Sequence, residues 1–145
     1  MDAPQRTEHL ICRHEGLRQT PYICPAGKLT IGVGRNLEAV GITEEEALYL
    51  FRNDLGRVRA ALDKRLSWWR RLDDVRQAVL ISMAFQLGPG GLLGFRRLLA
   101  ALEAGQWAEA AREMLDSQWA RQTPNRAAEL AEMVRGGLWP REERL

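Results

Sequence analysis

A glycine-rich stretch near the start of the chain limits what this sequence can fold into, because it interrupts a pattern that elsewhere predicts helices. The 23 residues HEGLRQTPYICPAGKLTIGVGRN, 14–36, contain four glycines. Two segments within them, 19–24 and 28–34, are rich in β-branched and aromatic residues, and the Pro-Ala-Gly between them is typical of a turn. The stretch therefore predicts a small antiparallel hairpin.

A long helix is predicted after the hairpin, over residues 43–64. Thr43 suits the N-cap position, and Glu46 three residues later completes a capping box. Large apolar residues recur at spacings of three and four, so one apolar stripe follows the helix. The stripe consists of Leu48, Phe51, Leu55, Val58 and Leu62.

Shorter helices are predicted on both sides of these elements. The segment TEHLICRHEG predicts a helix that ends at Gly16. Residues 73–88 are apolar enough for a central buried helix, which the following GPGG should break. Further helices are predicted in FRRLLAALEAG, QWAEAAREMLDSQWARQ and TPNRAAELAEMVRGG, the last with Thr123 as its cap and Pro124 in its first turn.

Together these elements predict an α+β fold that is mostly α, in one domain with two lobes. The first lobe, about residues 14–42, contains the hairpin. The second is helical and consists of about residues 72–139 and the N-terminal helix, and the long helix joins the two lobes. A cleft between lobes is a common place for a ligand.

Composition is that of a globular protein. The 145 residues suffice for one domain with a core, and 46% are apolar and 28% charged. No apolar run approaches the roughly 20 residues that span a bilayer, and the N-terminus lacks a signal-peptide pattern, so we expect synthesis and folding in the cytoplasm. Two cysteines, Cys12 and Cys24, are too few for a disulfide framework.

The charge is weakly basic, with a net value of +2. Such a balance fits a nucleic acid, an anionic membrane or an anionic polymer such as a bacterial cell wall, and equally an ordinary solvated surface. A nucleic-acid binder is disfavoured, because no arginine cluster with interleaved aromatics follows one face. The C-terminal WPREERL has too little apolar surface for a strong membrane anchor.

The tryptophans fall into two groups. Trp107, Trp119 and Trp139 occupy apolar helix positions and are expected in the core. Trp68 and Trp69, in SWWRR, are expected near a helix end. There they are either exposed to a membrane or wall, or partly buried where the lobes join.

Three residues of the glycine-rich stretch have chemistry that fits glycoside hydrolysis. Glu15 ends the first helix, Cys24 follows nine positions later, and Thr30 six after that. Acid-catalysed cleavage needs a protonated carboxyl group, and its inverting form needs a second group that holds and activates water. Glu15 suits the first role, and Cys24 with Thr30 the second. The same residues also fit a solvated glutamate, a small buried cysteine and an ordinary strand threonine.

The residues EGLR, Tyr22, Gly27 and TIGVGRN together resemble the catalytic opening of phage-type lysozymes, the T-even endolysin family. That family has a Glu, an Asp or sometimes a Cys nine positions on, and a Thr six further, which correspond here to Glu15, Cys24 and Thr30. The similarity continues in order along nearly the whole chain. It includes GITEEEA..LF..D, MAFQLG, GF, W.EAA, W..QTPNRA and GLW.

The resemblance implies a lysozyme fold that cleaves peptidoglycan at the β-1,4 bond from N-acetylmuramic acid to N-acetylglucosamine, with inversion. Glu15 would be the general acid, and Thr30 and Cys24 would position the water, with no metal or organic cofactor. Such enzymes lyse the phage host after release through a holin pore. Expected partners are therefore peptidoglycan and a holin, without nucleic acid or stable membrane insertion. We expect a monomer that stays in the host cytoplasm until it reaches the periplasm and wall.

Cys24 departs from the commoner Asp of the family. A thiolate is a competent general base and a neutral thiol is not, and an unperturbed thiol titrates near pH 8.5, so an alkaline optimum is expected. A thiolate that attacked the sugar directly would instead retain configuration. A third alternative is that cysteine impairs catalysis and leaves a peptidoglycan-binding module of the same fold.

Arg35 departs from the family's frequent His after the TIGxG strand. The resemblance pairs that position with Asp54 on the long helix, so an Arg35–Asp54 ion pair is predicted, which would not titrate near neutral pH. Two solvated surface charges are the alternative. The connection from Arg35 to Thr43 is also short, where larger members have an additional loop and helix.

The resemblance also implies supporting residues in the helical lobe. Arg126, in TPNRA, matches the position that hydrogen-bonds the catalytic Glu across the cleft, where a cation favours the carboxylate and burial opposes it. Phe85 and Gln86, in MAFQLG, resemble cleft-facing positions, and Gln122 lies within reach of the cleft. Core packing for Phe85 and an exposed helix position for Arg126 are the alternatives.

Overall fold

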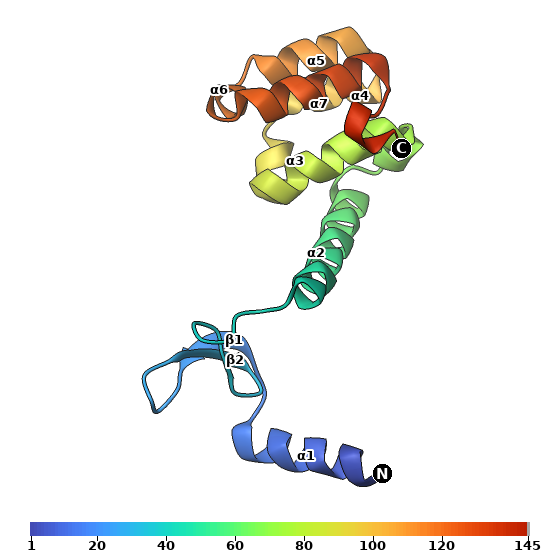
Figure 1. Ribbon diagram of the computed structural model, residues 1–145. Helices are drawn as coiled ribbons and strands as arrows, with labels where there is room; N and C mark the ends of the chain where they lie inside the picture. Colours follow the sequence, from blue (N-terminus) through green and yellow to red (C-terminus); the bar gives the residue numbers. More distant parts are fainter. Residues whose placement is uncertain (145) are drawn as a thin grey trace. The chain divides into compact units, whose positions relative to one another are not determined.

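The computed structural model describes residues 1–144 and shows a mostly helical chain with one small sheet (Figure 1). Over these residues there are seven α-helices, two short 3₁₀ helices and three antiparallel strands. The α+β fold class that the sequence predicts is confirmed. The chain divides into two compact units, of which the first is Met1–Leu50 and the second begins at Phe51. The predicted lobe boundaries, and the grouping of the N-terminal helix with the helical lobe, stay predictions.

The first helix, α1 (Ala3–Glu15), begins four residues earlier than the sequence pattern indicated. A capping box explains the difference: the Asp2 carboxylate accepts from the backbone N–H of Gln5, and the Gln5 side chain accepts from that of Asp2, both at 2.9 Å. The helix ends at Gly16, as predicted. Glu15 is thus the last helical residue.

The sheet consists of β1 (Arg18–Ile23), β2 (Leu29–Gly32) and β3 (Arg35–Asn36), in that order. Thr30 lies opposite Tyr22 on one side and Asn36 on the other. The predicted hairpin is confirmed, but the third strand was missed, because two residues are too short for any alternation to be visible. Thr30 is the one buried residue within positions 1–50.

The long helix, α2 (Glu44–Arg65), has the predicted capping box. The Thr43 hydroxyl accepts from the Glu46 N–H at 3.1 Å, and the Glu46 carboxylate accepts from the Thr43 N–H at 3.0 Å. On the apolar stripe, Val58 and Leu62 are buried.

The second unit is a helical cluster around one hydrophobic core. Its elements after α2 are η1 (Trp69–Arg71), α3 (Asp74–Leu93), α4 (Arg96–Glu103), α5 (Trp107–Leu115), α6 (Gln118–Gln122), α7 (Pro124–Gly136) and η2 (Arg141–Glu143). The core includes Leu62, Trp69, Val79, Leu80, Met83, Leu92, Leu98, Leu102, Met114 and Val134. The apolar α3 supplies its centre, as expected, and the predicted break appears as a non-helical Gly88 inside α3. In the described residues, no single helix is long and apolar enough to cross a membrane. Only α3 and α4 taken together have the necessary length and composition, and the chain bends by 103° between them.

Two details of the later helices differ from the sequence-based expectation. The segment QWAEAAREMLDSQWARQ forms two helices, because the Ser117 hydroxyl accepts from the Ala120 N–H at 3.1 Å and starts α6. The Thr123 side chain does not cap α7. Its hydroxyl instead donates to the carbonyl of Trp119 at 2.9 Å, whereas Pro124 does begin α7.

The burial of three tryptophans, Trp68, Trp69 and Trp139, differs from the prediction. Trp68 and Trp69 are fully part of the core, and the Trp69 indole N–H donates to Asp63 at 2.8 Å. Trp119 is buried as predicted, but Trp139 is 38% exposed, because it follows the end of α7.

A buried arginine joins α3 to the end of α7. Arg76 donates from Nε to the carbonyl of Val134 at 2.7 Å and from a terminal nitrogen to that of Arg135 at 3.3 Å. Its other terminal nitrogen pairs with Asp73 at 2.9 Å, and the guanidinium lies 3.8 Å from the centre of the Trp107 ring. These contacts satisfy carbonyls that the last turn of α7 leaves without partners.

Candidate active site

The predicted general acid, Glu15, lies against the turn between β2 and β3. A Cβ atom built on Gly34 would be 3.0 Å from one carboxylate oxygen of Glu15, which is closer than such atoms normally approach. Gly34 also has a φ of +66°, in the left-handed region that favours glycine. The absence of a side chain at Gly34 therefore makes room for the Glu15 carboxylate.

Cys24 and Thr30 come together at the other end of β2. Cys24 directly follows β1, and its backbone N–H donates to the carbonyl of Lys28 at 2.9 Å, which closes the β1–β2 turn. The buried Thr30 hydroxyl donates to that same carbonyl at 2.8 Å and lies within hydrogen-bonding reach of the Cys24 sulfur. The turn thus holds the half-buried Cys24 thiol next to the Thr30 hydroxyl, at one end of β2, whereas Gly34 lies in the turn at the other end of this strand.

The surroundings of Cys24 favour the thiolate. The backbone N–H of Lys28 lowers the pKa of the Cys24 thiol most, burial raises it to a smaller extent, and the Thr30 hydroxyl and the Ala26 N–H lower it further. The net pKa lies below the ordinary value, because a thiolate can accept several of these hydrogen bonds and a thiol cannot. The Thr30 hydroxyl has one proton, which can turn from the Lys28 carbonyl to the sulfur when the thiol ionises.

Arg35 and Asp54 each have an ion-pair partner in their own unit. Arg35 pairs with Glu46 at 2.7 Å and also donates to the carbonyl of Gly41 at 3.2 Å, which ties β3 to the start of α2. Asp54 pairs with Arg57 one turn along α2. The Arg35–Asp54 pair stays a prediction, because its two members belong to different units.

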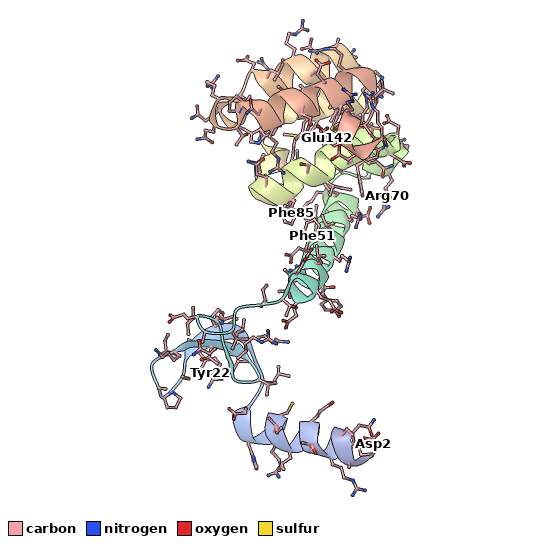
Figure 2. The ribbon with its side chains drawn as sticks, viewed as in Figure 1. Asp2, Tyr22, Phe51, Arg70, Phe85 and Glu142 are labelled. Carbon is pink, nitrogen blue, oxygen red and sulfur yellow. The ribbon has the colours of Figure 1, made fainter. Side chains whose placement is uncertain are left out.

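Three predicted residues of the second unit, Phe85, Gln86 and Arg126, lie on or contact one stretch of α3. Phe85 packs edge to face on Phe51, with the ring centres 5.4 Å apart (Figure 2). Gln86 accepts from the indole N–H of Trp119 at 2.9 Å. Arg126 of α7 donates to the hydroxyl of Ser82, one turn before Gln86, at 2.9 Å.

These contacts hold the side chains of α3 and α7 in defined positions, but they do not include Gln122. That residue is exposed at the end of α6. Sequence reasoning also missed Ser82, Gly34 and Glu46 as partners of predicted site residues. Ser82 lies three and four residues before Phe85 and Gln86, a spacing that indicates a shared helix face.

Within residues 1–144 there is no cluster of three or more His, Cys, Asp or Glu side chains that could hold a metal ion. A cavity of about 520 Å³ lies between the start of α4 and the end of α5, and none of the predicted site residues lines it.

Comparison with known proteins identifies the family. The family described as phage lysozyme matches residues 12–141, which include Glu15, Cys24, Thr30 and Arg126. The chain belongs to the phage lysozyme family. Since most of the chain is matched, the resemblance of the glycine-rich opening is part of a similarity that extends to the last helices.

Several phage lysozyme relatives are similar to this chain. "Probable T4-type lysozyme 1" of Dictyostelium discoideum is 34% identical over 99 residues, which are 66% of this chain and 58% of that protein. The "Pre-baseplate central spike protein Gp5" of Enterobacteria phage T4 is 31% identical over 156 residues, with 88% of this chain and 27% of that protein covered. An "Endolysin" of Acyrthosiphon pisum secondary endosymbiont phage 1 is 31% identical over 120 residues, covering 80% and 78%. The chain therefore spans 58% and 27% of the first two relatives.

Proposed function

We propose that this member of the phage lysozyme family is a muramidase that hydrolyses the β-1,4 bond between N-acetylmuramic acid and N-acetylglucosamine in bacterial peptidoglycan. The observation that carries the proposal is the set of three side chains, Glu15, Cys24 and Thr30, that lie in or beside the small sheet. The Cys24 thiol, whose pKa is lowered, lies in the β1–β2 turn beside the buried hydroxyl of Thr30 on β2, and the turn after β2 accommodates the Glu15 carboxylate. An acid and a water-activating pair are the two components that an inverting glycosidase needs.

In this proposal Glu15 protonates the glycosidic oxygen as the bond to the leaving sugar breaks. Its position at the end of α1, against Gly34, leaves the carboxyl group exposed for contact with substrate. On the opposite face of the sugar, the Cys24 thiolate accepts a proton from a water molecule that the Thr30 hydroxyl helps to orient. The water adds to the anomeric carbon, and the configuration is inverted.

The remaining predicted residues are assigned to supporting roles. Arg126, Phe85, Gln86 and Gln122 bind or orient the glycan, and the Arg35–Glu46 pair holds the end of the sheet against α2. The biological role that we infer is lysis of a phage host. It requires passage of the monomeric enzyme from the cytoplasm to the wall with the help of a holin.

The direct test is release of new reducing ends from purified Gram-negative peptidoglycan by the intact chain. The proposal expects clearing of the suspension and products that end in N-acetylmuramic acid. Inversion would appear by proton NMR as the α-anomer formed first. If the wall material is bound but no reducing ends are released at any pH from 5 to 9, the chain is a peptidoglycan-binding module and the enzyme proposal fails.

The pH profile is expected to follow Cys24. Because the thiolate is the base, the rate should rise as pH rises through the thiol pKa. The surroundings of Cys24 lower this pKa, so the rise should lie at lower pH than for an ordinary thiol. Cys24→Asp should shift the rise to below pH 5, near the pKa of an aspartate. Cys24→Ala should remove the rise and cost about 100-fold in rate. An unchanged profile in Cys24→Ala would show that the thiol takes no part, and a covalent glycosyl adduct on Cys24 would instead support direct attack.

Gly34 is expected to control the position of Glu15. In Gly34→Ala the new methyl group would displace the flexible end of the Glu15 side chain, so kcat should fall about tenfold or more while KM changes little. Gly32→Ala is a matched control, because Gly32 has a similar φ of +69° but no atom within 4 Å of a built Cβ. Equal kcat values in the two variants, measured on peptidoglycan fragments, would contradict this role.

A further inference from the structure

A cavity of the second unit is lined by none of the predicted site residues and has two tryptophans in its wall. It lies where η1 and the start of α3 meet the turn between α4 and α5 (Figure 1). Its volume is about 550 Å³, which is within the range of small-molecule sites. The polar and aromatic residues of its wall are Trp68, Arg71, Asp73, Glu103 and Trp107. We call it the tryptophan cavity.

Both tryptophans of the cavity have indole N–H groups that the protein leaves without a partner. The indoles of Trp69 and Trp119 donate to side-chain oxygens, whereas those of Trp68 and Trp107 form no hydrogen bond within residues 1–144. In the same residues no fully buried polar side-chain atom lacks a partner, so these two N–H groups are accessible, although Trp68 as a whole is only 8% exposed. Because both rings line the cavity, a ligand in it can use the two N–H groups as donors.

The charges of the tryptophan cavity balance one another. Asp73 is paired with the buried Arg76 at 2.9 Å. Arg71, at the end of η1, and Glu103, at the end of α4, are exposed and form no ion pair in the described part of the chain. An ion of either sign would therefore meet a like charge, whereas a neutral ligand can use the guanidinium as a donor and the carboxylate as an acceptor.

The rest of the wall is apolar and consists of the two indole rings, Leu72 and Leu102. A fitting ligand therefore has an apolar face for these side chains and both donors and acceptors around its edge. A sugar ring with an acetamido group has this combination, because its C–H groups lie on the ring faces while its hydroxyl and amide groups project outward. A small amino acid has donors and acceptors but no such face.

We propose that the tryptophan cavity is an additional subsite for an N-acetylhexosamine ring of the peptidoglycan glycan. The indole N–H groups of Trp68 and Trp107 donate to oxygens of the sugar, and the Glu103 carboxylate accepts from one of its hydroxyls. The inference rests on the proposed function, because it takes this glycan as the polymer that the protein meets. A second contact with the glycan keeps the enzyme on the wall between cleavage events, since the tethered protein rebinds before it diffuses away.

The test observes the indole N–H groups directly, by proton–nitrogen NMR of the full, isotopically labelled chain during titration with N-acetylglucosamine. Single Trp→Phe variants assign the signals. We expect the signals of Trp68 and Trp107 to move together, with one dissociation constant in the millimolar range that is usual for a single small ligand. The signal of Trp69, whose N–H is bonded to Asp63, should stay in place. Movement of the Trp119 signal reports binding near Gln86 instead.

Two double variants link these signals to the cavity without changing the tryptophans. Arg71→Ala with Glu103→Ala removes the two unpaired charged side chains of its wall. Arg121→Ala with Glu129→Ala is a matched control, because it removes two exposed charges of α6 and α7 and likewise leaves the net charge unchanged. We expect the first variant to weaken N-acetylglucosamine binding, followed at the Trp68 signal, by about tenfold, and the control to change it by less than about twofold.

Three results would overturn the subsite. One is a titration in which the Trp68 and Trp107 signals do not move. Another is movement of these signals with D-alanine that equals or exceeds their movement with the sugar, which would indicate a site for an amino acid. The third is equal weakening in the two double variants.

Hydrolysis of peptidoglycan fragments by the same chain tests the muramidase proposal separately. If fragments are not hydrolysed but the sugar moves the signals of the tryptophan cavity, the subsite is supported and the muramidase proposal fails. Hydrolysis without movement of these signals overturns the subsite alone. Hydrolysis together with the expected movement supports both.

Discussion

Replacing Glu15 by glutamine is expected to lower the rate of peptidoglycan hydrolysis by a factor of about 10² to 10⁴, the usual contribution of a general acid. Glutamine has nearly the same shape but has no acidic proton to give to the leaving oxygen. Glu15 is exposed at the end of α1, so the substitution should leave the fold unchanged. The measurement is release of reducing ends from sacculi, with thermal unfolding as a check of folding.

Glu8→Gln is a matched control for this result. Glu8 is an exposed glutamate on the same helix and is remote from the β2–β3 turn, so its variant should retain the full rate. Glu15→Gln should still bind sacculi, because the change affects a bond-breaking step. A Glu15→Gln variant with more than about a tenth of the parental rate would rule out Glu15 as the general acid.

Replacing Arg76 by methionine is expected to lower the free energy of unfolding by about 3 kcal/mol. The change leaves the carbonyl of the buried Val134 without its hydrogen bond, which alone costs about 1–3 kcal/mol. It also removes the contact with the Trp107 ring and the ion pair with Asp73. Denaturant unfolding followed by circular dichroism measures the loss.

Two companion variants show whether position and geometry are responsible. Arg112→Met removes an exposed arginine whose ion pair with Glu109 lies one turn away on α5, and its effect should stay below about 0.5 kcal/mol. Arg76→Lys keeps the charge but cannot reach two carbonyls and a carboxylate at once, so it should lose an intermediate amount. A methionine variant as stable as the parent would show that the carbonyls at the end of α7 need no side-chain partner.

Local sequence signals determined most of the secondary structure of this protein. The Thr43–Glu46 capping box and the glycine that ends α1 act within a few residues, so their effect is visible in the sequence alone. The same holds for the turn between β1 and β2, which places Cys24 beside Thr30. The sequence also identified the family, because the predicted site residues occur in a fixed order along the chain.

Only the tertiary structure decided which side chains share partners across long sequence distances. Nothing near Arg76 indicates that it satisfies carbonyls 58 and 59 residues away, and nothing near Gly34 indicates that its missing side chain makes room for Glu15. Trp68 and Trp69 read as exposed or half-buried because they follow a helix end, yet they pack in the core. Burial and hydrogen bonding at such positions depend on which elements meet in space, and a local sequence pattern does not determine which elements meet.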